Sequence, residues 1–387
     1  MTTGSDLGPP IPAGRSVNST ERIRAAIALD SADRVPVAPW LDHFAATYTG
    51  LSKDVFIRDA DKRFEAVLKT ARELGPWDMT YLAENVSKTL IMAAPARVRW
   101  PGRELPEDQV HQFEELELLG PEDYDLFERS GLLFFLREVA RRLYPEISAV
   151  RGLVMILSFV LGFRRHVKAL RAAGIEPAVG FMHPGPLFEY WSIGRSLRPM
   201  CTDLYDRPEA VKSAGRVWAR AMTRIAIHGA RVLGVDRVFL ALSRSSPAIL
   251  SPSHFEEFVY PDLKTIVGMM LESGITPVFH CDTGWTARLD VFRRFPAGRC
   301  IIELDGDTDM VSAHETLAGH MCIKGNVPAY LTAFATREEV LAYCRHLIET
   351  AGARGGFILS TGCSVPANAR AENVKAIFEA AEEWGRY

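Results

Sequence analysis

The chain has 387 residues and lacks several features that would define its class at once. Its six cysteines contain no closely spaced pair, which fits a reduced cytoplasmic protein better than a disulfide scaffold. The formal net charge of −3 argues against a general nucleic-acid-binding surface. The longest apolar run, residues 152–163, is too short to cross a bilayer as a helix, so we expect a buried or interface helix there.

Sequence motifs of several large enzyme classes are also missing. The chain has no G-x-x-x-x-G-K-[ST] phosphate loop, and no G-x-G-x-x-G follows a predicted strand. The G-x-S-x-G motif of serine hydrolases is absent as well. Residues 1–18 are rich in glycine, proline, serine and threonine without the apolar stretch of a signal peptide, so we expect a disordered lead.

What the sequence does contain is a succession of strands separated by helical patterns. The predicted strands are residues 34–40, 76–82, 176–185, 235–242, 276–281, 300–305, 321–326 and 355–362. Strands that alternate with helices pair in parallel, and eight of them predict an α/β protein with a (β/α)8 TIM barrel. We expect a single domain over residues 19–387 with helical insertions around 95–174; a doubly wound open sheet is the alternative.

Helix ends are marked by short polar patterns. Ser253 with Glu256, and Thr336 with Glu339, each have the spacing of a capping box. Pro261 is expected to kink or split the helix that begins near Ser253.

Side chains that bind metals follow the predicted strand ends, where the chemistry of such barrels collects. Because side chains alternate along a strand, His280 and Asp282 share one face and Cys281 takes the other. Glu303 and Asp305 likewise share a face of the next strand, and Cys363 follows the last one.

His280, Asp282 and Cys363, with Glu303 or Asp305 as a further ligand, offer nitrogen, oxygen and sulfur donors that zinc accepts. A structural role is the alternative, in which Asp282 caps the next helix and Cys363 only fills space.

Other strand-end residues are candidates for substrate contacts and proton transfer. Asp305 and His183 are the candidate catalytic residues, because a carboxylate and an imidazole can each move a proton. The candidate substrate-binding residues are Trp40, His43, Tyr81, Arg244, Lys324 and Asn326. Their aromatic members favour an apolar or aromatic ligand, and Lys324 could neutralise an anion.

Six segments of the chain resemble the uroporphyrinogen decarboxylase superfamily, which includes cobalamin-linked methyltransferases. They are "ERIRAAIALDSADRVPVAPW", "GFMHPGPLFEYW", "DLYDRPEAVKSA", "AILSPSHFEEFVYP", "KGNVPAYL" and "GGFILSTGCSVPANARAENVKAIFEAA". The resemblance implies a distorted (β/α)8 barrel with a deep pocket at the carboxyl ends of the strands.

The differences from the superfamily concern the site itself. Where true uroporphyrinogen decarboxylases have an arginine-rich segment, this chain has "APWLDHFAATYTG", and "STGCSVP" replaces their Gly-His-Gly. The methyltransferase branch holds zinc on a His-x-Cys pair and a distant Cys, which His280 and Cys363 match, whereas Asp282 occupies the middle position. A carboxylate oxygen is a harder metal ligand than a thiolate sulfur, so the metal site would suit an oxygen-bearing substrate such as a methoxy ether.

The leading hypothesis from this resemblance is a zinc-assisted methyltransferase. It would move a methyl group between a small molecule, such as a methoxylated aromatic, and a corrinoid supplied by a partner protein. A metal-free decarboxylase is the alternative, with Arg244 and Lys324 holding carboxylates; a third is a non-enzymatic binding subunit for a corrinoid protein. A homodimer is expected from the family and from the apolar helix at 152–163.

Overall fold

The computed structural model describes residues 17–387, so most of the predicted N-terminal lead lies outside the described residues. Asn18, which we had placed in that lead, instead caps the first helix, α1 (Ser19–Ile27). Its side chain accepts a hydrogen bond from the Glu21 N–H, and the Glu21 side chain accepts one from the Asn18 N–H. This reciprocal pair of hydrogen bonds is a capping box at the start of α1.

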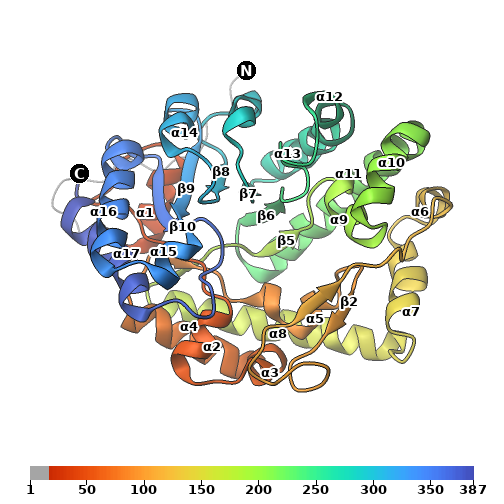
Figure 1. Ribbon diagram of the computed structural model, residues 1–387, viewed down its shortest axis with the longest axis horizontal. Coiled ribbons are helices and arrows are strands. Elements are labelled where there is room, and N and C mark those ends of the chain that lie inside the picture. Colours follow the sequence, from red (N-terminus) through yellow and green to blue (C-terminus); the bar gives the residue numbers. More distant parts are fainter. Residues whose placement is uncertain (1–16) are drawn as a thin grey trace.

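A parallel sheet forms the larger part of the barrel wall (Figure 1). Its hydrogen-bonded order within residues 17–387 is β10-β9-β8-β7-β6-β5, in which every pair is parallel. The strands are β5 (Phe181–His183), β6 (Arg237–Ala241), β7 (Thr276–Cys281), β8 (Ile301–Leu304), β9 (Cys322–Val327) and β10 (Phe357–Thr361).

Shorter ladders from the N-terminal half close the ring. β1 (Met79–Thr80) pairs in parallel with β4 (Glu176–Pro177), and Val37 forms a parallel bridge with Leu359 of β10. The Asp78 N–H donates to the Val37 carbonyl at 2.9 Å, and the Gly180 N–H donates to the Arg237 carbonyl of β6 at 2.8 Å. Since β4 and β5 continue one strand, residues 17–387 supply eight strand positions around a closed TIM barrel, and the open-sheet alternative is wrong.

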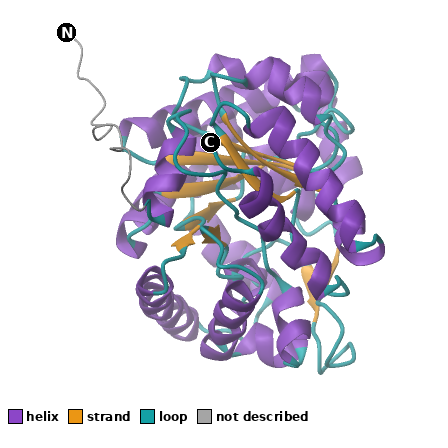
Figure 2. Ribbon diagram, turned by 90° about the vertical axis from the view of Figure 1, so that its left-hand side faces the viewer, coloured by secondary structure: helices purple, strands orange, loops and turns teal. Residues whose placement is uncertain are grey.

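Helices surround the strands (Figure 2). The N-terminal half contains α2 (His43–Thr49), α3 (Lys53–Arg58), α4 (Ala60–Glu73), η1 (Glu84–Val86) and α5 (Lys88–Ile91). Between β1 and β4 the chain forms an antiparallel hairpin and further helices: β2 (Arg97–Arg99), β3 (Gln112–Glu114), α6 (Asp123–Ser130), η2 (Phe135–Val139), α7 (Ala140–Leu143) and α8 (Ala149–Ala172).

After β5 the helices alternate with the strands. They are α9 (Leu187–Gly194), α10 (Leu197–Asp206), α11 (Pro208–Leu233), α12 (Pro252–His254), η3 (Phe255–Val259), α13 (Tyr260–Glu272), η4 (Thr286–Arg294), α14 (Met310–Leu317), α15 (Ala329–Phe334), α16 (Arg337–Leu347), η5 (Ile348–Gly352) and α17 (Ala371–Trp384). The capping box of Thr336 and Glu339 is confirmed at α16. The one at Ser253 is wrong, because Ser251 caps α12 with its hydroxyl.

Two separate apolar clusters follow from the alternation of side chains along the strands. One fills the barrel interior and includes Trp40, Tyr81, Phe239 and Val278. The other lies between the strands and the helices, and it takes Cys281 from β7. A residue's place in one cluster or the other therefore tells whether its side chain faces into the barrel.

The first half of α8 presents apolar side chains to solvent, so the 152–163 run is not buried within the chain. The exposed large apolar side chains of α8 are Val150, Leu153, Val154, Ile156, Leu157 and Leu161. None of the helices within residues 17–387 combines the length and the apolar character that crossing a membrane requires. All six cysteines of the chain are free thiols.

Candidate metal centre

The strand register places three ionisable side chains side by side inside the barrel. His280 of β7 pairs with Glu303 of β8, and Glu303 pairs with Lys324 of β9. All three face the interior, since each lies two residues beyond an apolar residue of the interior cluster, Val278, Ile301 or Cys322. They are nearly inaccessible, with 3%, 2% and 1% of their surface exposed.

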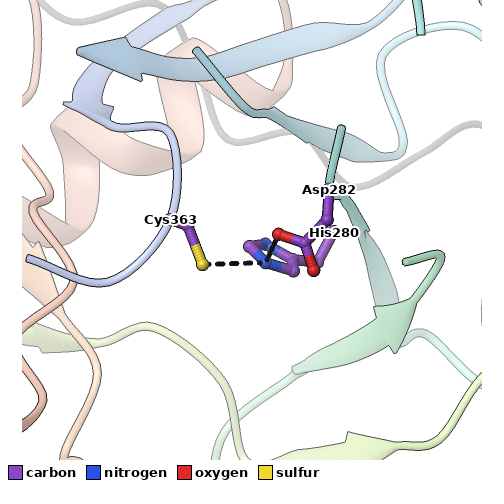
Figure 3. Close-up of side chains that lie close together, drawn as sticks. All are labelled: His280, Asp282 and Cys363. Atoms are coloured by element: carbon purple, nitrogen blue, oxygen red, sulfur yellow. Dashed lines mark hydrogen bonds and ion pairs between the residues drawn. The ribbon is translucent and has the colours of Figure 1, made fainter. Parts of the chain in front are cut away.

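The two nitrogens of the His280 imidazole contact different side chains. Nε2 lies 3.0 Å from Asp282 Oδ1 and 3.6 Å from Cys363 Sγ (Figure 3). Nδ1 lies 2.9 Å from Glu303 Oε2 on the other side of the ring. The sulfur comes from the loop after β10, so segments about eighty residues apart in sequence meet at one nitrogen.

The distances fit a metal ion of the zinc type. The ligand atoms of His280, Asp282 and Cys363 all lie within 4.8 Å of one another. Zinc bonds of about 2.0–2.1 Å to nitrogen and about 2.3 Å to sulfur place these atoms about 3.5 Å apart at a tetrahedral angle. The nitrogen–sulfur distance of 3.6 Å meets that value, and the nitrogen–oxygen distance of 3.0 Å needs to open by a few tenths of an ångström.

Glu303 is placed differently from our prediction of a metal ligand. It contacts Nδ1, whereas the other two donors gather at Nε2, and the two nitrogens of one ring point in different directions. The carboxylate therefore orients the imidazole so that Nε2 lies on the side of Asp282 and Cys363, where a metal would bind. Lys324 Nζ at 2.8 Å and the Tyr81 hydroxyl at 2.7 Å hold Glu303 Oε1 in turn.

The positive and negative groups of the cluster stabilise one another's charged forms, although all of them are largely buried. Burial raises the pKa of Asp282, but the hydrogen bond with His280, the charge of that ring and the hydrogen bonds with Ser243 and Cys363 together lower it to about 2. Burial also raises the pKa of Glu303, but the charges and hydrogen bonds of Lys324 and His280 together lower it to about 2. Burial lowers the pKa of His280, yet its three hydrogen-bond partners hold that pKa well above its usual value. Both carboxylates are therefore ionised at neutral pH, and a bound metal would displace the proton on Nε2.

Aromatic rings form the wall beside this cluster. Trp40 stacks on Tyr81 with ring centres 4.2 Å apart, and its edge meets the His280 ring at 5.0 Å. Phe239 lies 5.0 Å from the same imidazole. These rings keep water from the inner side of His280, while Asp282 and Cys363 remain partly exposed and form the open side.

Asp42 is a further ionisable residue near the cluster that the sequence analysis missed. It accepts hydrogen bonds from Trp40 Nε1 and Asn85 Nδ2, each at 2.9 Å. Burial raises its pKa to about 7, although those hydrogen bonds, one from Ser364 and the nearby His280 all oppose the rise. Its position two residues after Trp40, just past a predicted strand, was the signal that could have identified it.

Several predicted site residues lie outside the cluster. His183 faces α11, where its Nε2 lies 3.3 Å from Thr223 Oγ1. Its Nδ1 accepts from the Gly185 N–H of the turn after β5 at 3.0 Å. Burial lowers the pKa of His183 to about 3 and leaves it neutral. Asp305 accepts hydrogen bonds from the Gly306 N–H of its own loop and from the Thr283 N–H of the loop after β7.

The remaining three candidates are also engaged elsewhere. Asn326 donates to the Thr308 carbonyl at 2.9 Å, which ties down the loop after β8. Arg244 donates to the Ser192 carbonyl at 2.9 Å and contacts Glu115. His43 lies 3.3 Å from His111 of the inserted hairpin, away from the row of ionisable residues on β7, β8 and β9.

A parallel barrel with a polar cluster at the carboxyl ends of its strands defines a TIM-barrel enzyme. The uroporphyrinogen decarboxylase (URO-D) family matches residues 180–384, more than half of the chain. The chain belongs to this family of enzymes.

Individual relatives agree with this assignment. Uroporphyrinogen decarboxylase from Crocosphaera subtropica is 25% identical over 95% of this chain and 96% of that enzyme. The enzyme of the same name from Anaeromyxobacter dehalogenans is 28% identical over 136 residues, which cover 35% of this chain and 38% of the enzyme. Among solved structures, a methyltransferase from Methanosarcina mazei superposes with a TM-score of 0.69 at 16% identity, covering 95% of this chain and 99% of that one. This last likeness concerns the fold.

Proposed function

We propose that the protein is a methyltransferase that moves a methyl group between a small molecule and a corrinoid carried by a partner protein. The observation that carries the proposal is the convergence of Asp282 Oδ1 and Cys363 Sγ on His280 Nε2. Three donors on one open side leave a fourth position for a substrate, as catalytic zinc sites do. The Methanosarcina methyltransferase supports it through its similar fold.

Zinc held by His280, Asp282 and Cys363 would act as a Lewis acid on the oxygen of a methyl ether and ease departure of the methyl group. The chain's own residues fix the three donors. Ser243 donates to Asp282 Oδ2, which leaves Oδ1 to face the imidazole. Glu303 fixes the ring through Nδ1.

Asp42 is the group we propose for proton transfer at this site. Demethylation of an aryl ether leaves an oxygen that gains negative charge, and a group with a pKa close to neutral donates a proton to it efficiently. The pKa of Asp42, raised by burial to about 7, meets that requirement, and Asp42 is close enough to His280 for their charges to interact. Trp40 and Tyr81 are buried on the inner side, where they form the apolar wall behind His280.

The metal-free decarboxylase remains the second candidate because the curated relatives are uroporphyrinogen decarboxylases. Substrate carboxylates would then need free cations near the site. Lys324 is already paired with Glu303 at 2.8 Å, and Arg244 is occupied by Ser192 and Glu115. The two cations that this alternative requires are therefore engaged within the chain.

A direct assay tests the proposal. Purified protein is incubated with methoxyarenes and Co(I)-cobalamin, and methylcobalamin formation is followed by absorbance. The proposal predicts methyl transfer that a chelator abolishes and that His280→Ala lacks. Carbon dioxide release from a carboxylic acid, undiminished by chelator, would support the decarboxylase instead.

The homodimer is also a proposal, supported by the exposed apolar face of α8. Light scattering of the purified chain tests it, since a monomeric mass at micromolar concentration would contradict it.

A further inference from the structure

A hollow separate from the candidate metal centre lies beside the inserted hairpin. It encloses about 180 Å³ between α5, the β2–β3 connection and the start of α8. Its lining residues are Lys88, Met92, Trp100, Arg103, Tyr144, Glu146, Ile147 and Arg151. None of these belongs to the centre around His280, and Figure 1 shows β2 and α5 well apart from β7.

The charge of this cavity is unbalanced. Lys88, Arg103 and Arg151 line it, and Glu146 is its one acidic lining residue. Among the residues described, these three cations form no ion pair with a carboxylate. Nearby arginines behave differently, since Arg58 pairs with Asp54 at 2.7 Å.

The cations are close enough to affect one another. Burial, followed by the charge of Arg103, lowers the pKa of Lys88, and Arg58 and Arg151 add to the effect. Lys88 also sits 6.0 Å above the Trp100 ring, which holds its ammonium group over the aromatic wall. Like charges gathered in a partly enclosed space repel each other unless an anion lies between them.

Two further features favour an anion in the same place. The Tyr144 hydroxyl is buried and has no hydrogen-bond partner among residues 17–387, although a buried hydroxyl normally has one. Arg151 lies in the first turn of α8, whose N-terminal end adds partial positive charge to that of the side chains.

A neighbouring cavity provides room for the rest of a larger ligand. It encloses about 430 Å³ and shares Trp100, Arg103, Tyr144 and Glu146 with the first. Its charges are balanced, because three arginines face three glutamates and Arg99 lies 3.7 Å from Glu114. An anionic group therefore belongs in the first cavity, and an uncharged or aromatic remainder fits beside Trp100 in the second.

We propose that the cavity lined by Lys88, Arg103 and Arg151 binds a phosphate-type dianion, either as the free ion or as the phosphate group of a larger molecule. Two positive charges in excess of Glu146 match the charge of a phosphate near neutral pH. Tyr144 donates a hydrogen bond to the bound oxygen, and the arginines supply further donors.

Isothermal titration calorimetry of the full chain with inorganic phosphate tests the proposal at constant ionic strength. We expect saturable binding below 1 mM, weakened at least tenfold in Lys88→Met and abolished in Lys88→Met combined with Arg151→Gln (about tenfold corresponds to one lost charged hydrogen bond). The same titration with phenyl phosphate distinguishes the sources: tighter binding than phosphate indicates a larger aromatic ligand, and equal binding indicates the free ion.

Two controls locate the site. Arg164→Gln removes the same charge from an exposed position of α8 outside the cavity, and binding should stay unchanged. His280→Ala should also bind phosphate normally, which separates this site from a metal-bound phosphate. Absence of saturable binding, or equal affinity in the parent and the Lys88→Met/Arg151→Gln variant while circular dichroism shows both folded, overturns the proposal.

Discussion

His280 and Glu303 are direct neighbours across two parallel strands, and Nδ1 of the imidazole lies 2.9 Å from Oε2 of the carboxylate. This contact decides which ring nitrogen is free. Because Nδ1 is occupied, Nε2 faces Asp282 and Cys363 on the open side of the barrel. The arrangement of the three candidate ligands therefore depends on a carboxylate that contacts the opposite nitrogen of the ring.

Glu303 has two proposed roles, which substitutions can separate: it neutralises Lys324, and it orients the His280 ring. Glu303→Gln leaves Lys324 as an uncompensated buried charge, which we expect to cost about 3–5 kcal/mol of unfolding free energy. Adding Lys324→Met should restore most of that stability, yet zinc affinity should stay about 10–100-fold below the parent. Urea unfolding and chelator competition measure the two quantities. If the double variant regained full zinc affinity, Glu303 would have no orienting role.

Asp282 is predicted to limit how tightly the centre holds zinc. Asp282→Cys replaces a hard oxygen by a soft thiolate, so zinc should bind about tenfold more tightly. Turnover of a methyl ether should fall, because the added thiolate makes zinc a weaker Lewis acid. Competition with a chromophoric chelator and the methylcobalamin assay follow these effects. Asp282→Ala is the control, and it should lose affinity; equal affinity in all three proteins would contradict the assignment.

His183 should matter for stability and not for turnover. His183→Ala leaves the Gly185 N–H without its acceptor and opens space against Thr223, so we expect a loss of about 2–4 kcal/mol. The rate constant kcat should remain within about threefold of the parent, since the ring faces α11. A large fall in kcat in a variant that is still folded would return His183 to the catalytic residues.

Asp262 should make stability depend on pH. It is buried in α13, where its Oδ2 accepts from the Leu187 N–H at 3.2 Å, and burial raises its pKa from 3.8 to about 7. The folded chain then holds a proton that the unfolded chain releases, so this carboxyl lowers stability as pH rises from about 4 to about 7. Without this carboxyl, Asp262→Asn should lose up to about 4 kcal/mol less unfolding free energy between pH 4 and pH 7 than the parent. Parallel urea titrations from pH 4 to 8 check it, and identical slopes for both proteins would disprove it.

The barrel could be predicted from the sequence because its strands are apolar runs separated by helices. The rule of alternating side chains also placed His280 and Asp282 together, since β7 is long and its register is fixed on both sides. The same rule did not determine which face of β5 carries the His183 side chain. β5 is three residues long, and Met182 rather than His183 joins the interior cluster.

The roles of the buried charges could not be predicted for a different reason. Sequence spacing identifies Glu303 as a neighbour of His280, but only coordinates show which ring nitrogen it contacts. Asp42 was missed because its raised pKa comes from burial within the folded protein.

X-ray absorption at the zinc edge of the purified protein reports on the proposed zinc ligands themselves. A site made of His280, Asp282 and Cys363 should hold stoichiometric zinc with one sulfur ligand at about 2.3 Å and nitrogen or oxygen ligands at about 2.0–2.1 Å. Cys363→Ser should remove the sulfur contribution and leave the others. Zinc without any sulfur ligand, or a protein that retains no zinc after preparation with the metal present, would contradict the account.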